Sequence, residues 1–467
     1  MIDPTALYQQ RSAEFGAAAA TYDQRARRQG NISLGLFFGA IVLLIVALWN
    51  DNTLLTALAV LCTVAFIASL VYRNRLNRLQ RRFATLQALN QEGLHRLARQ
   101  WDGLPLPPPA AVDAAPPAPP AHLDPATASD LDLLGRASLE QLLGTPTTPV
   151  GWSTLRTWLL TPALPATVRA RQAAAAELAP QVELREEMGL SGRLMESTQA
   201  EYEQFIAWAE RPGWLHHRPW LVWATRLLPL AALGCFVTAL LGWPTTPALV
   251  AILVINLALS FTIGGRVSDD ITQVSARQGV FAAYAGMFRL LAKQSFSAPA
   301  LQALQAQLTA DHAPADRQMH RLEQLMPLAD IRRSLIFIVI EAATLWSFHL
   351  LWLLERWKEH AGSHVRAWLM VLGEAEALIA LATLHFDHPA WTFPDLLEAS
   401  EPRFDAIGLA HPLLPPARAV GNDVTLGPPG SFLLVTGSNM AGKSTLLRAI
   451  GVNTVLAQMG APVSATR

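Results

Sequence analysis

The sequence predicts a mainly α protein with two transmembrane helical hairpins, a helical core and the start of a C-terminal α/β domain. Three observations predict this fold class. Four apolar runs are each about long enough to cross a hydrocarbon core of roughly 30 Å. Helical periods dominate most of the remaining chain. A glycine-rich loop then follows a short apolar run near the carboxyl end. The length of 467 residues leaves room for about three domains.

Composition favours a membrane protein and argues against a strongly basic binder. Lys plus Arg number 36 and Asp plus Glu number 36, so no net positive charge attracts nucleic acid, and a histone-like or arm-type binder is excluded. Charged residues make up only 15% of the chain and hydrophobic residues 51%, whereas about 25% charged is usual. Cys62 and Cys235 both lie in apolar runs, which excludes a disulfide framework or a cysteine metal site of the usual spacing.

The first pair of apolar runs predicts a transmembrane hairpin over residues 32–72. Ile32–Trp49 and Thr53–Tyr72 are separated by a polar turn at 50–52, so the chain is expected to cross and return. Residues 1–31 then form a cytoplasmic N-terminal segment, because arginines flank both ends of the hairpin: Arg25, Arg27, Arg28, Arg73, Arg75, Arg78, Arg81 and Arg82. A cleaved signal peptide is the alternative, which the long leader and the second span disfavour.

Two further segments separate this hairpin from the next helical region. Residues 73–103 predict a basic amphipathic helix close to the inner leaflet, since apolar residues recur there at helical spacing among arginines. Those arginines either face solvent or contact anionic lipid or nucleic acid. Residues 104–128 form a Pro-rich linker, because nine prolines fall between Leu104 and Pro125. A domain boundary is therefore expected in the linker.

A second predicted transmembrane hairpin, residues 220–264, divides the helical core into two segments. Its runs, Trp220–Leu241 and Pro247–Gly264, are joined by a short uncharged turn. Helical periods dominate on both sides, so residues 129–219 form the first segment of the core and residues 265–388 form the second.

The run Leu335–Leu354 is also about long enough to span a membrane. A fifth crossing would place the carboxyl-terminal loop on the outer side, away from cytoplasmic nucleotide. Glu341 and His349 would also be costly in lipid. We therefore expect this run to be a buried helix of the cytoplasmic core.

Residues 389–467 predict the beginning of an α/β domain with a phosphate-binding loop. Phe432–Val435 is a short apolar run of the buried-strand type. It leads into a match to G-x-x-x-x-G-K-[ST], which requires a strand before it and a helix after it. The candidate nucleotide-binding residues are Gly437, Ser438, Asn439, Met440, Ala441, Gly442, Lys443, Ser444 and Thr445.

Each residue type in this loop suits the binding of nucleotide phosphates. Gly437 and Gly442 allow successive backbone N–H groups to point inward at phosphate oxygens. Lys443 supplies a positive charge for the β and γ phosphates, and the Ser444 hydroxyl is placed to coordinate Mg²⁺. A helix that begins near Lys443 adds its N-terminal dipole. ATP and Mg²⁺ are therefore the expected ligands.

This loop resembles that of the ATPase domain of the MutS family of DNA mismatch repair proteins. Thr436–Arg448 carries a distinctive Asn-Met pair inside the loop, and the likeness continues through Leu456–Gly460 and Pro462-Val463. Other segments look like the lead-in strands and the start of the helical core of that family: His411-Pro412, Asn422-Asp423, Leu131–Pro162 and Arg171–Leu178. The second hairpin interrupts the region where the family's DNA-clamping helices would lie.

The overall layout looks like the membrane-anchored, MutS-like ATPases of bacteria. The resemblance implies a multi-pass protein of the inner membrane, with its N-terminus and ATPase domain in the cytoplasm and ATP-driven closure of a homodimer. It also implies mismatch repair and binding of mismatched DNA. DNA binding rests on the resemblance alone, because the Phe-x-Glu wedge that stacks on a mispaired base in mismatch-detecting members occurs nowhere in this chain.

A complete ATPase of this type needs a later strand that ends in Asp and Glu, which hold Mg²⁺ and position the attacking water. The sequence runs only 24 residues past Lys443 and contains neither residue in that context. We therefore expect a C-terminally truncated chain that has no catalytic residues of its own and binds ATP without hydrolysing it. Two other classes stay open: an ABC-like membrane transport ATPase, and a non-catalytic membrane scaffold with a nucleotide site.

Three further features carry less weight. His216-His217 fits an interfacial polar pair better than a metal site, because no carboxylate or thiol is near in sequence. Trp346, Trp352 and Trp357 fit core packing better than a stacking stripe for nucleic acid bases. By analogy with the family, Phe404 and His411 are expected to pack near the nucleotide base.

Overall fold

The computed structural model describes residues 3–50, 52–106, 123–195, 198–275, 279–309, 314–334, 336–397, 403–437 and 442–467. The chain is mainly helical, as the sequence predicts, and forms two compact units. One unit comprises Met1–Leu104 with Pro415–Ala417, and the other comprises Pro105–Leu414 with Arg418–Arg467. Most of the predicted Pro-rich linker, residues 107–122, lies outside the described residues.

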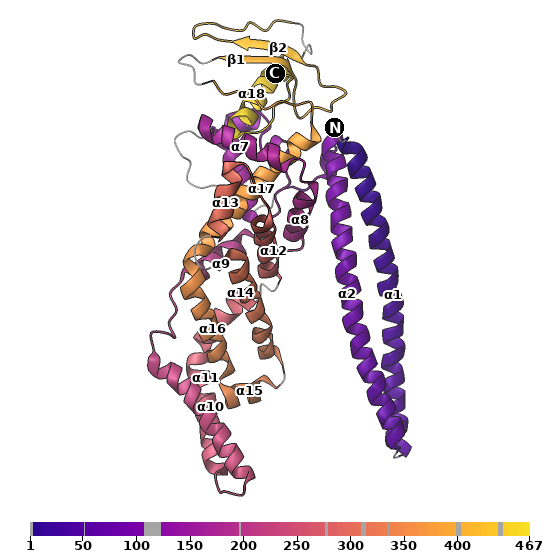
Figure 1. The fold of residues 1–467 in the computed structure, drawn as a ribbon, viewed down its shortest axis with the longest axis vertical. Helices are drawn as coiled ribbons and strands as arrows, with labels where there is room; N and C mark the ends of the chain where they lie inside the picture. Colours follow the sequence, from indigo (N-terminus) through magenta and orange to yellow (C-terminus); the bar gives the residue numbers. More distant parts are fainter. Residues whose placement is uncertain are drawn as a thin grey trace. The chain divides into compact units, whose positions relative to one another are not determined.

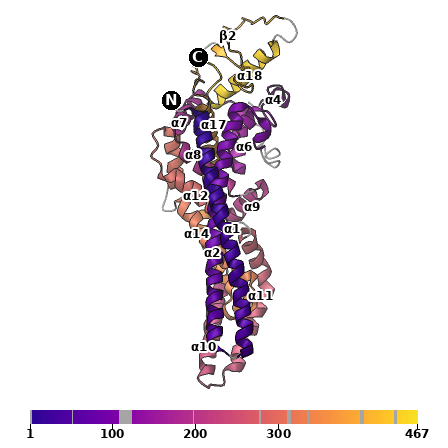
Figure 2. The ribbon, with the colours of Figure 1, turned by 90° about the vertical axis from the view of Figure 1, so that its right-hand side faces the viewer.

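The first unit is a long helical hairpin, here called hairpin 1. It consists of α1 (Pro4–Asn50) and α2 (Thr53–Ala98), followed by the short η1 (Trp101–Gly103), and Figure 2 shows α1 and α2 side by side. Asn52 caps α2, because its Oδ1 accepts from the backbone N–H groups of Leu54 and Leu55 at 3.0 and 3.3 Å. The neighbouring turn residue Asp51 lies outside the described residues.

The two helices of hairpin 1 remain in contact well beyond the apolar runs. Tyr22 of α1 stacks on Phe83 of α2 with ring centroids 5.5 Å apart, and Leu76 and Leu86 are buried. The basic amphipathic segment expected at 73–103 is therefore mainly the second half of α2, and α1 covers its apolar side. The segment is helical as expected over most of its length, but it continues α2 and packs on α1. Its position close to the inner leaflet stays a prediction.

The second unit is a helical core built around α17 (Val365–Asp387), which is buried over most of its length (Figure 1). Its other helices pack on α17 or on one another. They are α4 (Pro125–Asp130), α5 (Leu139–Leu142), α6 (Pro149–Leu160), α7 (Pro165–Leu178), α8 (Val182–Arg193), α9 (Gln199–Glu210), α12 (Val280–Lys293), α13 (Pro299–Thr309), α14 (Ala315–Asp330), α16 (Trp346–Ala361) and η3 (Gly362–His364).

A buried carboxylate joins α17 to the start of α6. Glu376 accepts hydrogen bonds from the backbone N–H groups of Thr147 and Thr148, at 2.9 and 3.3 Å, and from both threonine hydroxyls. The Thr148 hydroxyl in turn accepts from Gly151 N–H and caps α6. Burial raises the pKa of Glu376, while the hydrogen bonds from Thr147 and Thr148 oppose that shift. Long-range contacts therefore fix residues 147–148, which directly precede α6.

A second helical hairpin, here called hairpin 2, extends from this core. It consists of α10 (Pro219–Leu240) and α11 (Thr246–Ser275), joined by a turn in which Gly242 has a φ of 87°. Glu355 of α16 holds its base: the carboxylate is 2% exposed and accepts from the backbone N–H groups of Trp214, Leu215 and His216 at 2.7 to 3.0 Å. The base of hairpin 2 is thereby tied to the core through a buried carboxylate.

Apolar side chains cover the outside of both hairpins. Five stretches of the described chain are long and apolar enough to cross a membrane, by length and composition: Pro4–Asn50, Thr53–Ala98, Pro219–Leu240, Thr246–Val274 and Trp346–Asp387. The apolar window of the fifth stretch is 83% buried inside the protein, whereas those of the other four are only 6 to 17% buried. The first four stretches thus leave large apolar surfaces exposed, and the fifth forms core.

The run Leu335–Leu354 is two helices, which corrects the expectation of one buried helix. After η2 (Ile331–Arg333), α15 (Phe337–Thr344) ends where Leu345 adopts a left-handed conformation with φ 52°, and α16 begins at the next residue. Most of α16 is buried, but the outer side chains of α15 are exposed. Hydropathy alone predicted one element, because the residues on both sides of Leu345 are equally apolar.

The C-terminal region holds a two-stranded antiparallel sheet and one helix. Strand β1 (Phe404–Leu409) pairs with β2 (Asn422–Leu426), and α18 (Lys443–Met459) lies nearby (Figure 2). The prediction of a buried strand at Phe432–Val435 was wrong: that run forms no strand, and Phe432 is 84% exposed. A strand needs a neighbour to satisfy its backbone groups, and in the described part of the chain this run pairs with neither β1 nor β2.

Candidate phosphate-binding loop and its adjoining pocket

The candidate site is the loop that leads into α18. The helix begins at Lys443, as the sequence predicts, and Gly442 precedes it with a φ of 81°, a left-handed conformation that favours glycine. No side chain caps this helix end. The first-turn N–H groups, including those of Lys443, Ser444 and Thr445, therefore have no side-chain partner from the cap position, which is the arrangement of an anion-binding helix end.

The structure describes five of the nine predicted site residues. Gly437, Gly442, Lys443, Ser444 and Thr445 are described, whereas Ser438, Asn439, Met440 and Ala441 lie outside the described residues. Lys443 is half-buried, and its ammonium group donates a hydrogen bond to the carbonyl oxygen of Gly437. Ser444 and Thr445 are exposed. Lys443 thus links the start of α18 to Gly437, the first glycine of the loop.

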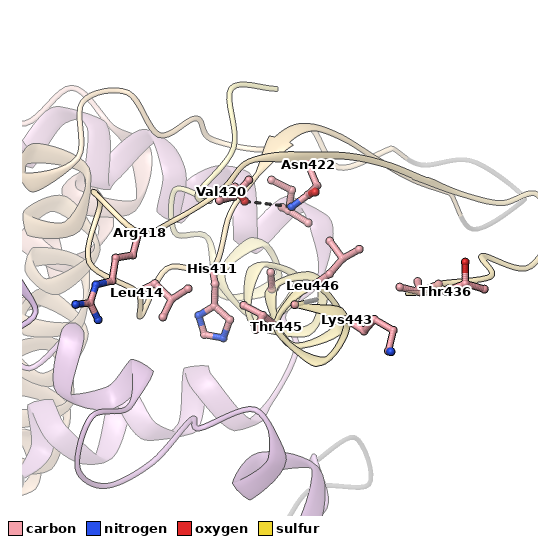
Figure 3. A pocket seen from close by; sticks show the side chains of 13 residues that line it. His411, Leu414, Arg418, Val420, Asn422, Thr436, Lys443, Thr445 and Leu446 are labelled. Carbon is pink, nitrogen blue, oxygen red and sulfur yellow. Dashed lines mark hydrogen bonds between the residues drawn. The ribbon is translucent and has the colours of Figure 1, made fainter. Parts of the chain in front are cut away.

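A pocket of about 490 Å³ adjoins the loop (Figure 3). Its walls come from α18, from the segment before the loop and from the region between β1 and β2. Gly442, Lys443 and Thr445 line the pocket, whereas Gly437 and Ser444 do not. This volume falls within the range of roughly 300 to 1,000 Å³ that is usual for small-molecule sites.

His411 lines the same pocket, whereas Phe404 does not. That either residue packs near a nucleotide base stays a prediction. The imidazole is nearly buried, and its Nδ1 accepts a hydrogen bond from the backbone N–H of Leu413 at 3.3 Å. Burial lowers the pKa of His411, and Arg448 adds to that effect while Asp132 opposes it. His411 therefore presents a neutral ring to the pocket at neutral pH, which suits contact with an uncharged base.

Sequence reasoning did not assign several residues of the pocket wall to the site, among them Leu414, Arg418, Val420 and Asn422. Figure 3 shows His411 and Leu414 on one side of α18, and the ammonium end of Lys443 pointing away from them. Asn422 donates from its side chain to the carbonyl oxygen of Val420 at 3.1 Å. These residues carry no motif, and the reversal of the chain between β1 and β2 brings them to the loop.

Long-range contacts hold α18 in place beneath the loop. The Asn453 side chain donates to the carbonyl oxygen of Ala410 at 2.9 Å and accepts from the backbone N–H of Ser464 at 2.7 Å. Arg448 pairs with Asp132 at 3.0 Å. These contacts fix α18 against Ala410, the residue next to His411.

The far end of α18 docks on the helical core. Arg171 of α7 donates to the carbonyl oxygen of Met459 at 3.2 Å, and its guanidinium lies 3.6 Å from the ring centroid of Trp158. Burial lowers the pKa of Arg171 to about 10, and Glu374 opposes that shift. The core therefore supports the helix that presents the loop.

The weaker candidates have structural roles. His216 lies 2.9 Å from Glu355 and 3.7 Å from Glu359, two carboxylates that sequence distance had hidden. No metal-binding group of three or more His, Cys, Asp or Glu side chains exists among the described residues. The contacts of His216 with Glu355 lie at the base of hairpin 2. Trp357 is buried and stacks on Trp208 at 5.9 Å, which confirms the core-packing interpretation for that tryptophan.

Comparison with known proteins finds local similarity to the MutS family. The chain is 34% identical over 94 residues to the putative endonuclease MutS2 of Bacillus subtilis, which is 19% of this chain and 12% of that protein. It is 39% identical over 116 residues to the DNA mismatch repair protein MutS of Azorhizobium caulinodans (22% and 12%) and 38% identical over 95 residues to the DNA mismatch repair protein MSH2 of Zea mays (19% and 10%).

No family model matches the chain. The matched segments span about an eighth of the length of these curated relatives. These findings support a MutS-like relationship over about a fifth of the chain.

Proposed function

We propose that this protein is a membrane-anchored, MutS-like protein that binds ATP with Mg²⁺ at the loop 437–445. The observation that carries the proposal is the loop itself. In its G-x-x-x-x-G-K-S sequence the second glycine, Gly442, has a left-handed conformation, and α18 starts at the lysine that follows. A lysine ammonium and uncapped helix N–H groups together favour a multiply charged phosphate.

The residues present fit the proposed ligands. Lys443 would pair with the outer phosphates as a point charge, and the N–H groups of the first turn of α18 would donate to phosphate oxygens. The exposed hydroxyl of Ser444 is a ligand of the kind that Mg²⁺ accepts together with phosphate oxygens and water. The bound Mg²⁺ would supply charge neutralisation between the phosphates. His411 and Leu414 would line the part of the pocket away from the lysine, where a flat base can pack.

Hairpins 1 and 2 are the proposed membrane anchors. The exposed apolar surfaces over 32–72 and 220–264 support this proposal, because a soluble monomer rarely leaves such contiguous apolar surface in water. Two hairpins give four crossings of a bacterial inner membrane. The N-terminus and the loop would then both lie on its cytoplasmic side, where ATP is available. The arginines that flank hairpin 1 agree with this orientation.

The similarity to proteins named for DNA mismatch repair extends the proposal to duplex DNA and to a nucleotide-controlled homodimer. Both components are tested by adding duplex DNA to the full chain in detergent at increasing salt, with and without ATP, and measuring mass by light scattering. Salt-sensitive binding of DNA and an ATP-dependent doubling of mass are expected. Binding that ignores salt contradicts the DNA component, and a mass that ATP leaves unchanged contradicts the dimer.

The nucleotide site is tested with two of the three lysines of the chain. Lys443→Ala should weaken the binding of ATP with Mg²⁺ by about 10- to 100-fold, because it removes a charged hydrogen bond to phosphate. Lys293→Ala, at the exposed end of α12, is the matched control and should bind as the unchanged protein does. Calorimetric titration of the purified chain measures both. Equal affinity of the two variants contradicts a phosphate site at this loop.

Membrane orientation needs its own experiment. Single cysteines placed near the N-terminus and near Arg467, in a background without Cys62 and Cys235, are labelled from either side of sealed inner-membrane vesicles. Both should react only from the cytoplasmic side. Labelling of either end from the opposite side contradicts the four-crossing arrangement.

A further inference from the structure

The helices α15 and α16 both pack on α11 of hairpin 2. The membrane anchors proposed above do not account for this packing. Arg332, just before α15, donates to the Ser268 hydroxyl at 2.8 Å. Further along α15, Glu341 accepts from the Ser260 hydroxyl at 2.8 Å. Finally, Ala342 accepts through its carbonyl oxygen from Asn256 at 2.7 Å. As the chain advances along α15, its partners on α11 move steadily backward, so the two helices lie antiparallel in contact.

These contacts give α15 a depth relative to the proposed span. Ser268 lies beyond the end of that span at Gly264, whereas Ser260 and Asn256 lie four and eight residues inside it. At 1.5 Å per helical residue these positions are about 6 and 12 Å inside the boundary. A hydrocarbon core is roughly 30 Å thick. Because α15 continues two residues past Ala342, it descends from the boundary to about the midplane and ends there.

The chain then returns to the side from which it came. Leu345 reverses the direction, with its N–H donating to the carbonyl oxygen of Glu341 at 2.8 Å, and α16 begins at Trp346. Nine residues along α16, Glu355 binds the backbone of residues 214–216 at the base of hairpin 2. The pair α15–α16 thus enters and leaves at the same boundary.

The Glu341 carboxylate at this reversal finds its partners inside the protein, and the Asn256 side chain donates within the protein although its Oδ1 has no partner among the described residues. Glu341 is 5% exposed and also accepts from the N–H and the hydroxyl of Ser347 at 2.9 and 3.0 Å. Asn256 is fully buried on the facing side of α11. A backbone break at membrane depth is tolerated only when such groups find partners within the protein. The Glu341 carboxylate beside the turn at Leu345 meets that condition.

The outer face of α15 is apolar where water would favour polar residues. Ile336, Ile338 and Val339 are 63%, 61% and 66% exposed, whereas the carboxylate of Glu341 points inward. A helix on the surface of a soluble core shows the opposite pattern. The apolar surface of the helix that α15 packs against also includes Val254, which is 61% exposed.

We propose that α15 and the turn at Leu345 form a re-entrant element, in which lipid acyl chains cover Ile336, Ile338 and Val339. The proposal rests on the membrane anchoring proposed for hairpin 2 and adds a fifth embedded segment without adding a crossing. An odd number of hydrophobic segments then remains compatible with a cytoplasmic loop at residues 437–445.

The test uses single cysteines in the full chain, in a background with Cys62→Ser and Cys235→Ser. Val339→Cys and Ile338→Cys probe α15, and Val254→Cys probes the proposed span. Leu164→Cys probes the cap position of α7 in the core, where Leu164 is 75% exposed. Each cysteine carries a small fluorophore, and the protein is reconstituted in lipid vesicles. Quenching by brominated acyl chains is compared with quenching by iodide in the water.

The Val339 and Ile338 labels should lose as much fluorescence to brominated lipid as the Val254 label, while iodide quenches only the Leu164 label. Lipid quenching at Val254 together with iodide quenching at Val339 and Ile338 overturns the re-entrant element and leaves the anchor intact. If iodide also quenches the Val254 label, the proposed membrane anchoring of hairpin 2 is contradicted as well. Labels on α15 that neither quencher reaches, but that iodide reaches after dilution of the protein in the bilayer, identify a second copy of the chain as the cover and also overturn the proposal.

Discussion

Hairpins 1 and 2 have similar hydropathy but are held in different ways. Hairpin 1 has helices of 47 and 46 residues that pack on each other along their length. Its buried polar contacts stay between those helices, as where the Ser33 and Ser69 hydroxyls meet at 2.6 Å. Hairpin 2 has helices of 22 and 30 residues, and α11 directs Asn256, Ser260 and Ser268 at other elements. One hairpin is self-contained, and the other belongs to the core.

Buried carboxylates explain the difference. Hairpin 2 depends on Glu355 at its base and on Glu341 along its side, and each of them accepts several hydrogen bonds. Among the described residues of α1 and α2, no carboxylate is buried. Substitution of a carboxylate that accepts several hydrogen bonds leaves several buried donors unsatisfied at once. Single substitutions should therefore destabilise hairpin 2 far more than hairpin 1.

The largest expected effect is at the base of hairpin 2. Glu355→Ala removes the acceptor of three backbone N–H groups and should destabilise the second unit by about 3 to 5 kcal/mol. Hydrogen exchange in detergent should speed up in peptides covering 214–240 and stay unchanged in α1 and α2. Glu359→Ala is the control, because Glu359 also approaches His216 but is half exposed, and should change stability by about 0.5 kcal/mol or less. Equal effects of the two substitutions contradict the role given to Glu355.

Overpacking hairpin 1 should have a smaller effect, confined to that hairpin. A Cβ at Gly93 would lie 2.8 Å from ring carbons of Tyr8, so Gly93→Leu should cost about 1 to 3 kcal/mol. At Gly39 nothing lies within 4 Å, and Gly39→Leu should leave stability unchanged or slightly increased. Hydrogen exchange of α1 and α2 measures both variants. Faster exchange of α10 and α11 in Gly93→Leu would show that the two hairpins are energetically coupled.

The pH dependence should also belong to the second unit. Burial holds the pKa of Glu376 above its ordinary value, so between the ordinary and the raised pKa the folded state binds more protons than the unfolded state. Its contribution to the free energy of unfolding therefore falls as pH rises through that window. Glu376→Gln should abolish this fall, as measured by denaturant unfolding at several pH values. Persistence of the full decrease in the variant would assign it to another group.

The smallest effect is expected inside hairpin 1. Ser33→Ala removes one buried hydroxyl contact with Ser69, while Gln29 still donates to Ser69 at 2.7 Å. The expected loss is about 1 kcal/mol. Ser260→Ala makes the same change in hairpin 2 but removes a donor to Glu341, so it should cost more. Equal losses would remove the distinction between a self-contained hairpin and one built into the core.

Local patterns were sufficient for several features of this chain. Hydropathy and a polar or glycine-containing turn located the helices of both hairpins, because those signals depend on neighbours in the sequence. The start of α18 at Lys443 likewise follows from the loop motif. Helical periods correctly predicted a mainly helical core around α17.

Tertiary structure decided what local patterns could not. Phe432–Val435 has the composition of a buried strand but is exposed, because burial of a strand depends on the elements beside it. The run Leu335–Leu354 divides at Leu345 because Glu341 finds partners on α11 and on the far side of the turn. The pocket beside Lys443 likewise includes Leu414 and Asn422, which sequence distance separates from the loop.

The sequence by itself determined where this chain is apolar, where it turns and where a phosphate-loop motif lies. The tertiary structure decided which apolar runs become core and which carboxylates bind which N–H groups, as at Glu355 and Glu376. The physical reason is the distance along the chain over which each interaction acts. Hydropathy and helix periodicity act over a few residues, whereas a buried carboxyl group is stabilised by donors that lie more than a hundred residues away in the chain.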